Sequence, residues 1–150
     1  MGKKEKNNIV SRLNELLATY QIHYQNLRSL HWNIKGPHFF ELHLKYEELY
    51  TRTQVIIDDL AERILTYEAV PLHTFADYVK TSLIKENAYI SDGKEGMKYI
   101  VEAQKSLLKT EREILAAAGE ADDEGTSAFM SDLIREKEKS TWMFSAWLGK

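Results

Sequence analysis

Residues that break helices are few in this chain, and their positions constrain its fold more than any other feature. There are two prolines, Pro37 and Pro71, and seven glycines in 150 residues. Proline interrupts a helix because it lacks a backbone N–H and its ring clashes with the preceding turn. Between the breaks, apolar residues recur at steps of three and four, which places them on one face of a helix. The pattern therefore predicts long amphipathic helices, and no strand-like alternation competes with it.

Four long helices and one short helix account for this pattern. Their boundaries are predicted from N-cap residues before each periodic run and from glycine or proline after it. The long helices are expected from Asn7 or Asn8 to Gly36, from Phe39 to Tyr67, from Ser91 or Asp92 to Gly119, and from Thr126 to Leu148. Thr74 is expected to cap the short helix, which runs through Tyr78. The residues expected to point inward from the last helix are Phe129, Leu133, Met143, Phe144 and Trp147. The predicted fold class is all-α: a four-helix bundle with a short extra helix in a long crossover between the second and third long helices.

The composition excludes several classes of site. Hydrophobic residues make up 43% of the chain and charged residues 29%, and there is no cysteine. The lack of cysteine removes disulfides, thiolate metal sites and cysteine nucleophiles. No stretch approaches the ~20 apolar residues of a membrane-spanning helix, and the polar start lacks the apolar core of a secretory signal. We expect a single cytoplasmic domain over residues 1–150, in which residues 1–6 form a short, basic, disordered tail.

Histidines and acids at the two ends of the second predicted helix form a candidate metal site. His43 lies early in the second helix, and His31 lies near the end of the first. Asp58 and Glu62, four residues apart, share a face later on the second helix. Asp58 follows His43 by 15 residues, which is ~22 Å along a continuous helix but only ~60° from the same face. One metal ion cannot reach both ends. Two copies packed antiparallel about a two-fold axis would bring the histidine end of one to the acid end of the other.

This set of residue types suits iron, manganese or zinc. Glu47 lies four residues after His43, on the same helix face, and is a further candidate. On spacing alone, a solvated acidic face and hydrogen-bonded histidines are the more common explanation.

Two runs of the sequence carry a more specific signal. They are HWNIKGPHFFELH from His31 to His43, and DDLAER from Asp58 to Arg63. In composition and separation they resemble the two signatures of the Dps family, the miniferritins of the ferritin-like superfamily. A weaker third feature is Trp142-Met143 near the C-terminus. The resemblance covers essentially the whole chain, and it implies a ferritin-like bundle that assembles through two-fold dimers into a hollow homo-dodecamer.

The same resemblance implies roles for individual residues. The ferroxidase ligands would be His31 and His43 of one subunit with Asp58 and Glu62 of its two-fold partner. Glu47 stands where the family often has a further acid near a second iron position, so at most two iron ions are expected per intersubunit site.

The resemblance also implies an activity. Trp32 stands where the family has an aromatic side chain that is proposed to donate or trap electrons. The family oxidises Fe(II), preferentially with hydrogen peroxide, and keeps the ferric mineral inside its shell, which would protect the cell against oxidative damage.

Charged clusters near the chain ends each have two interpretations. Glu120, Asp122, Asp123 and Glu124 precede the last helix, where acids favour a helix N-terminus. Alternatively, they line a three-fold pore that draws Fe(II) inward. Lys3, Lys4 and Lys6 keep the start of the chain hydrated, or they contact DNA phosphates through many copies acting together. The net charge of −3 opposes DNA binding, so DNA compaction is the alternative and iron oxidation the favoured function.

Two further classes of helical bundle make different predictions. A ferritin with a di-iron site inside one bundle needs Glu-x-x-His pairs, and the sequence contains none. A purely structural bundle would show no iron-dependent absorbance and form no large particle. His23, His38 and His73 are expected to be core or surface residues rather than ligands. Ser140 stands where many relatives have a histidine, two residues before the tryptophan of the last helix. This difference concerns the structure of the last helix and not the expected iron ligands.

Overall fold

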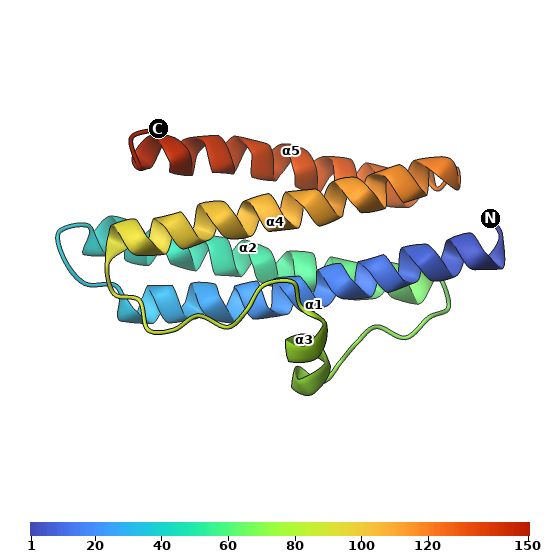
Figure 1. Ribbon diagram of the computed structural model, residues 1–150, viewed down its shortest axis with the longest axis horizontal. Coiled ribbons are helices and arrows are strands. Elements are labelled where there is room, and N and C mark those ends of the chain that lie inside the picture. The colour runs from blue at the N-terminus through green and yellow to red at the C-terminus, as the bar shows by residue number, and fades with distance from the viewer.

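The protein is an all-α bundle in the computed structural model, which describes residues 1–150 (Figure 1). The helices are α1 (Lys3–Asn33), α2 (Phe39–Thr66), α3 (Phe75–Thr81), α4 (Gly93–Glu120) and α5 (Glu124–Trp147). Helices α1 and α2 form one antiparallel hairpin and α4 and α5 another (Figure 1). The crossover from α2 to α4, which contains α3, runs back along the bundle, so α2 and α4 are parallel. This confirms the predicted four-helix bundle with a short extra helix. No helix is both long and apolar enough to cross a membrane.

Side-chain caps explain where three of the helices begin. Thr74, Asp92 and Asp123 each accept a hydrogen bond from the backbone N–H three residues later, at the starts of α3, α4 and α5. Such a bond satisfies one of the N–H groups that the first turn leaves without a partner. The predicted caps Thr74 and Asp92 are confirmed, while α5 begins two residues before the predicted Thr126 because Asp123 caps it.

Two expectations from the sequence are wrong. Helix α1 begins at Lys3, not near Asn7 or Asn8, because the Glu5 carboxylate accepts from the Gly2 N–H at 3.1 Å and completes the first turn. The lysines expected in a tail therefore lie on the first turn of a helix. Met143 was expected inside, but it is 43% exposed, whereas Phe144 is buried. Neighbouring residues of a helix point about 100° apart, so only one of the two can face the core.

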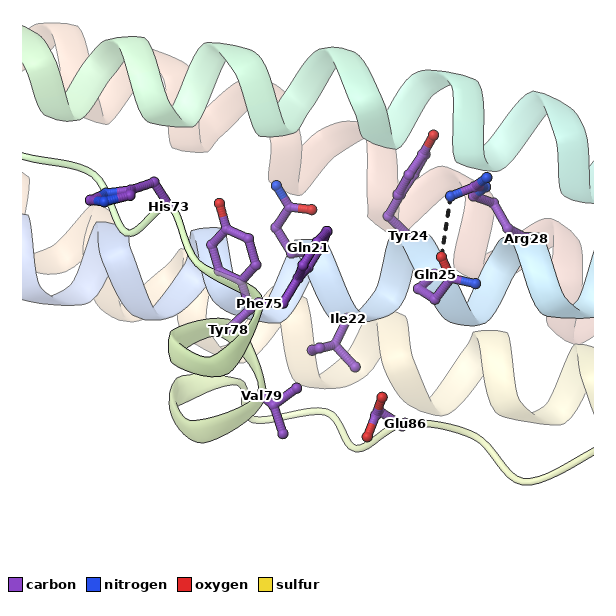
Figure 2. A pocket seen from close by; sticks show the side chains of 10 residues that line it. All are labelled: Gln21, Ile22, Tyr24, Gln25, Arg28, His73, Phe75, Tyr78, Val79 and Glu86. Atoms are coloured by element: carbon purple, nitrogen blue, oxygen red, sulfur yellow. Dashed lines mark hydrogen bonds between the residues drawn. The ribbon is translucent and has the colours of Figure 1, made fainter.

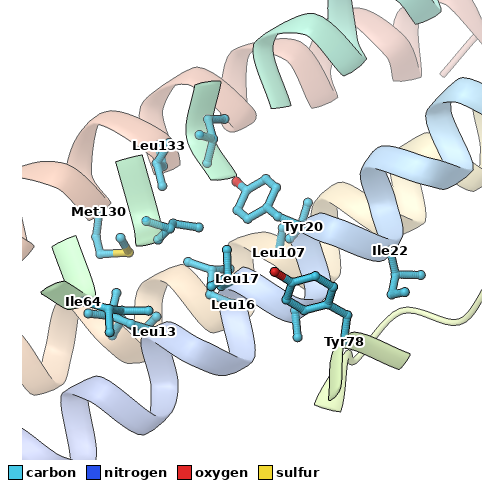
Figure 3. Packing of buried hydrophobic residues seen from close by; sticks show 14 of the residues in the cluster. Leu13, Leu16, Leu17, Tyr20, Ile22, Ile64, Tyr78, Leu107, Met130 and Leu133 are labelled. Carbon is cyan, nitrogen blue, oxygen red and sulfur yellow. The ribbon is translucent and has the colours of Figure 1, made fainter. Parts of the chain in front are cut away.

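The hydrophobic core lies between the two hairpins and extends along their whole length. Figure 3 shows Leu13, Leu16 and Leu17 of α1 packed with Leu107 of α4 and Met130 of α5. A second cluster around Leu27, Leu42 and Phe144 fills the end of the bundle near the α1–α2 turn. Because each long helix buries a continuous stripe, the four helices are held in register and their exposed faces have fixed orientations.

Polar side chains of α1 hold the crossover against the bundle. The backbone N–H of Leu72 donates to Asn14, and that of Leu83 donates to Thr19, at 2.8 and 3.1 Å. The buried Asn26 makes two such bonds, donating to the carbonyl of residue 85 and accepting from the N–H of residue 87. The irregular stretches of the crossover on either side of α3 keep some of their backbone groups paired in this way.

Asn26 also organises a buried chain of hydrogen bonds that ends at His23. Its amide donates to the Tyr99 hydroxyl at 2.8 Å, and that hydroxyl is hydrogen-bonded to His23 Nδ1 at 2.9 Å. His23 is only 4% exposed. Burial, and secondarily the positive charge of Lys137, lower the pKa of His23 to about 3. His23 is therefore a neutral core residue, as expected.

The neutral state of His23 makes the fold sensitive to acid. The unfolded chain protonates His23 near pH 6.5 while the folded chain does not, so the free energy of unfolding falls as pH decreases from about 6.5 towards 3. The slope from this one group is at most about 1.4 kcal/mol per pH unit. In His23→Asn, whose amide oxygen can still accept from Tyr99, urea unfolding at a series of pH values should show a shallower slope. The exposed His73→Asn serves as the control and should keep the wild-type slope.

Gly96 of α4 leaves room for the end of the Tyr46 side chain, which extends from α2. A Cβ atom at this position would lie 2.6 Å from the Tyr46 hydroxyl and 3.4 Å from Leu30. The Tyr46 hydroxyl is buried without a hydrogen-bond partner, and burial raises the pKa of Tyr46 to about 12. The Tyr46 hydroxyl can therefore occupy its place in the core only because residue 96 has no Cβ atom.

Gly96→Ala should lower the free energy of unfolding by about 1–2 kcal/mol, because the clash outweighs the better helix propensity of alanine. Adding Tyr46→Phe should recover most of the loss, since it removes the clashing atom. Gly119→Ala is the control: nothing lies within 4 Å of its added Cβ, so it should be neutral or stabilise by up to about 1 kcal/mol. Equal losses for the two alanine variants in urea unfolding would contradict this account of the packing.

Candidate metal centre

The turn between α1 and α2 brings His31 and His43 face to face. Their rings stack with centroids 3.8 Å apart and an interplanar angle of 14°. His31 Nδ1 lies 2.7 Å from the backbone carbonyl oxygen of His43, and His43 Nδ1 lies 2.8 Å from that of His31. A carbonyl oxygen only accepts, so each Nδ1 carries the proton and donates it. Each Nε2 therefore keeps its lone pair free in the neutral ring, as a metal ligand requires.

Neighbouring side chains hold the two rings in this orientation. Phe39 stacks on His43 with centroids 5.0 Å apart, and the edge of Tyr50 meets His31 at 5.3 Å. His31 is 7% exposed. Glu47 lies on the same side, with its Oε1 3.8 Å from His31 Nε2. The mutual carbonyl bonds and these aromatic contacts were not foreseen from the sequence; only the spacing of the histidines around Gly36-Pro37 pointed to them.

Trp32 follows His31 on α1 and is 57% exposed. The guanidinium of Arg28 lies 4.8 Å from its ring centroid, in position for a cation–π interaction. The exposed indole is placed at the surface of α1, beside the histidine pair in sequence and about 100° from His31 around the helix.

Asp58 and Glu62 lie together on the exposed face of α2, one turn apart. A hydrogen bond with Asp58, followed by the negative charge of Asp58, raises the pKa of Glu62. Two carboxylates this close repel each other, and a bound cation would relieve the repulsion. The pair is therefore suited to bind a metal ion, although it provides too few ligands alone.

A single chain does not bring the histidines and the acids together. Helix α2 is unbroken from Phe39 to Thr66, so His43 and Asp58 stay ~22 Å apart along its axis. No three His, Asp or Glu side chains of one chain are close enough to share a metal ion. The structure thus pairs His31 with His43, and Asp58 with Glu62, at opposite ends of one helix.

A groove with both apolar and polar lining residues lies beside α1. Figure 2 shows a groove of about 570 Å³ between α1 and α3, where Tyr24 and Arg28 of α1 face Phe75, Tyr78 and Val79 of α3. Phe75 is 84% exposed and Val79 53%. Large exposed apolar side chains of this kind mark surfaces for association. None of the candidate ligands lines the groove.

The acidic loop before α5 divides into a structural acid and three free ones. Asp123 is buried; it accepts from Arg63 at 2.9 Å and from the hydroxyl of Tyr67. Burial alone would raise the pKa of Asp123, but hydrogen bonds from Tyr67 and Thr126 outweigh it and lower the pKa. Asp123 therefore caps α5 and anchors it to α2, in agreement with the expectation that these acids favour the helix N-terminus. The acids that remain exposed are Glu120, Asp122 and Glu124.

Comparisons with known proteins agree with this architecture. A family model for the ferritin-like domain matches residues 10–150. The sequence is 51% identical to that of a Dps protein from Vibrio cholerae whose crystal structure is known. That protein is described as a member of a broad superfamily of ferritin-like diiron-carboxylate proteins. The TM-score is 0.97, and the match covers 99% of this chain and 93% of that one.

Relatives identified by their sequences support the same family. An uncharacterised protein of Haemophilus influenzae is 47% identical over 97% of this chain and 91% of its own. The DNA protection during starvation protein of Porphyromonas gingivalis is 38% identical over 95% of this chain and 89% of its own. The fold, the family model and these relatives together show that the chain belongs to the Dps family of ferritin-like proteins.

Proposed function

We propose that this protein oxidises Fe(II), preferentially with hydrogen peroxide, and stores the ferric product inside a hollow homo-dodecameric shell. The observation that carries the proposal is the reciprocal arrangement of His31 and His43, which leaves two Nε2 lone pairs available side by side. Membership of a ferritin-like family supports it, as does the description of the Vibrio cholerae protein as one of a diiron-carboxylate superfamily. The expected cytoplasmic location stays a prediction.

The metal site in this proposal is shared between two chains. His31 and His43 of one chain meet Asp58 and Glu62 of a second, because an antiparallel pair of α2 helices matches the histidine end to the acid end. Each two-fold dimer then has two identical sites. Glu47, close to His31 Nε2, is placed to help hold a second iron ion.

The redox balance requires two electrons for each peroxide. Two Fe(II) ions give one electron each, two protons are taken up, and hydrogen peroxide is reduced to two water molecules. When only one Fe(II) is bound, a second Fe(II) that binds transiently supplies the second electron. Trp32 stands where an aromatic side chain is proposed to donate or trap electrons. Consuming Fe(II) and peroxide together prevents hydroxyl radical formation, which is the protective role that we propose.

The exposed acids before α5 are proposed to attract Fe(II) to the shell. Glu120, Asp122 and Glu124 are solvated, and a ring of such acids focuses a negative potential that concentrates cations. Asp123 is not included in this role, because its carboxylate accepts hydrogen bonds from Arg63 and Tyr67.

DNA binding is the second candidate function. The observation that favours it is that the Porphyromonas gingivalis relative is a DNA protection during starvation protein. In this chain, Lys3, Lys4 and Lys6 lie on the first turns of α1, where twelve copies on a shell could act together. The formal net charge of −3 per chain works against it. Iron oxidation therefore remains the primary proposal.

Removing both histidines tests the chemistry. His31→Ala combined with His43→Ala should slow peroxide-driven Fe(II) oxidation by about 100-fold or more, since each site loses both nitrogen ligands. The rate is followed by the ferric absorbance after mixing Fe(II) and peroxide, and the particle size is checked by gel filtration. His38→Ala with His73→Ala, two exposed histidines, is the matched control and should oxidise at the wild-type rate. An unchanged rate in the first variant would exclude these ligands.

Mixing two inactive chains tests whether the site is shared. One chain carries His31→Ala and His43→Ala, and the other carries Asp58→Asn and Glu62→Gln. In a mixed dimer, one of the two sites receives intact histidines from one chain and intact acids from the other. Co-assembled shells should therefore regain about a quarter of the wild-type oxidation rate with random pairing. Shells formed separately and then combined should stay inactive. No recovery on co-assembly would mean that the ligands do not meet across two chains.

A further inference from the structure

A series of aromatic contacts leads away from the candidate metal centre. The edge of the Tyr50 ring, on α2, meets the His31 ring with centroids 5.3 Å apart. Tyr50 also forms an edge-to-face pair with Tyr24 of α1, with centroids 6.0 Å apart. Tyr24 lines the groove between α1 and α3 (Figure 2). The contacts therefore connect a candidate nitrogen ligand to a surface groove through two tyrosines, and the proposed iron chemistry gives neither tyrosine a role.

Trp32, the other oxidisable side chain near the centre, has different surroundings. The ring contacts of His31 and His43 do not include Trp32. Instead, the Arg28 guanidinium lies over the indole, 4.8 Å from its centroid. Removing an electron from an indole leaves a radical cation, which this positive charge destabilises. A phenol releases its proton as it is oxidised and becomes a neutral radical, and no cation lies over the Tyr50 ring. Contact and charge therefore both favour Tyr50 over Trp32 as an electron donor.

The proposed reaction lacks an electron whenever a site holds one Fe(II) and no second ion arrives. One Fe(II) gives hydrogen peroxide only one electron, and the products are Fe(III), hydroxide and a hydroxyl radical. A tyrosine that gives a second electron completes the reduction. In that balance Fe(II), hydrogen peroxide, the phenol and one proton from solvent become Fe(III), two water molecules and a neutral tyrosyl radical. The phenol thus supplies one electron and one of the two protons that peroxide takes up.

We propose that Tyr50 supplies this electron when no second Fe(II) is present, and that Tyr24 then shares the oxidised state. The inference rests on the proposed ferroxidase function. Tyr50 contacts the ring of His31, whose Nε2 is free to bind the ion, so the electron crosses a single ligand. Tyr24 extends the path away from the iron, to the groove surface. A packing role would need only the two rings, whereas electron donation also needs the Tyr50 hydroxyl.

The test looks for the radical directly. Assembled protein is loaded with one Fe(II) per site, mixed with excess hydrogen peroxide, frozen and measured by electron paramagnetic resonance. The radical signal should narrow in protein made with ring-deuterated tyrosine and not with ring-deuterated tryptophan. Tyr50→Phe keeps the ring but not the oxidisable hydroxyl, so it should lose the tyrosyl signal. Tyr24→Phe should retain it, because Tyr50 is still present. The matched control is Tyr89→Phe, an exposed tyrosine outside the path, which should give the wild-type signal.

A spin trap for hydroxyl radical separates a lost electron donor from a disturbed site. With one Fe(II) per site, Tyr50→Phe should release more hydroxyl radical than the wild type. With two Fe(II) per site the second ion supplies the electron, so the difference should disappear.

The ferric absorbance of the same samples distinguishes failure of this inference from failure of the proposed function. If no ferric product forms, both are overturned. If ferric product forms but the wild type shows no tyrosyl signal, or Tyr50→Phe retains that signal in full, only the role of Tyr50 is overturned. An excess of hydroxyl radical in Tyr50→Phe that persists with two Fe(II) per site would also overturn it, because the substitution would then have disturbed the site itself.

Discussion

The straightness of α2 is the constraint on which the rest of the site depends. An unbroken helix holds its residues at fixed axial distances, so His43 and Asp58 cannot converge within one chain. The chain reverses at Gly36-Pro37, which places His31 of α1 against His43 of α2. Each ring donates a hydrogen bond from Nδ1 to the backbone carbonyl of the other histidine, and these two bonds orient both rings. The same rigidity presents Asp58 and Glu62 on a surface where only another molecule could complete their coordination. Association and chemistry are thereby linked through the geometry of one helix.

Polar groups inside the bundle have a different purpose from those at its surface. Asn14, Thr19 and Asn26 hold the crossover in place, and this keeps α4 parallel to α2 and the core closed. Glu111 and Lys137 neutralise each other in the interior, whereas Asp58 and Glu62 repel each other on the exposed face.

Most of the architecture could be predicted from the sequence, because helix periodicity, caps and breakers are local signals. The extents of α2 and α4 and the cap of α3 followed from Asp92, Thr74 and the two prolines. The start of α1 was misjudged because Glu5 reaches back to the chain start, a contact that competes with the attractive caps at Asn7 and Asn8. Met143 was misjudged for a tertiary reason, because Phe144 takes the inward position. The pairing of Asp123 with Arg63 and Tyr67 of the neighbouring helix could not be predicted from the sequence either, because it joins residues far apart in the chain.

The sequence by itself determined the helix content, the long crossover and the residue types of the candidate site, since these depend on spacing along one chain. It also determined that His43 and Asp58 are too far apart to share an ion, because helix rise is a property of the backbone. Only the tertiary structure decided which nitrogen of each histidine is free, which acid is buried and that a lysine neutralises the core. Those features depend on contacts between residues distant in sequence, and no local pattern specifies which side chains meet across the bundle.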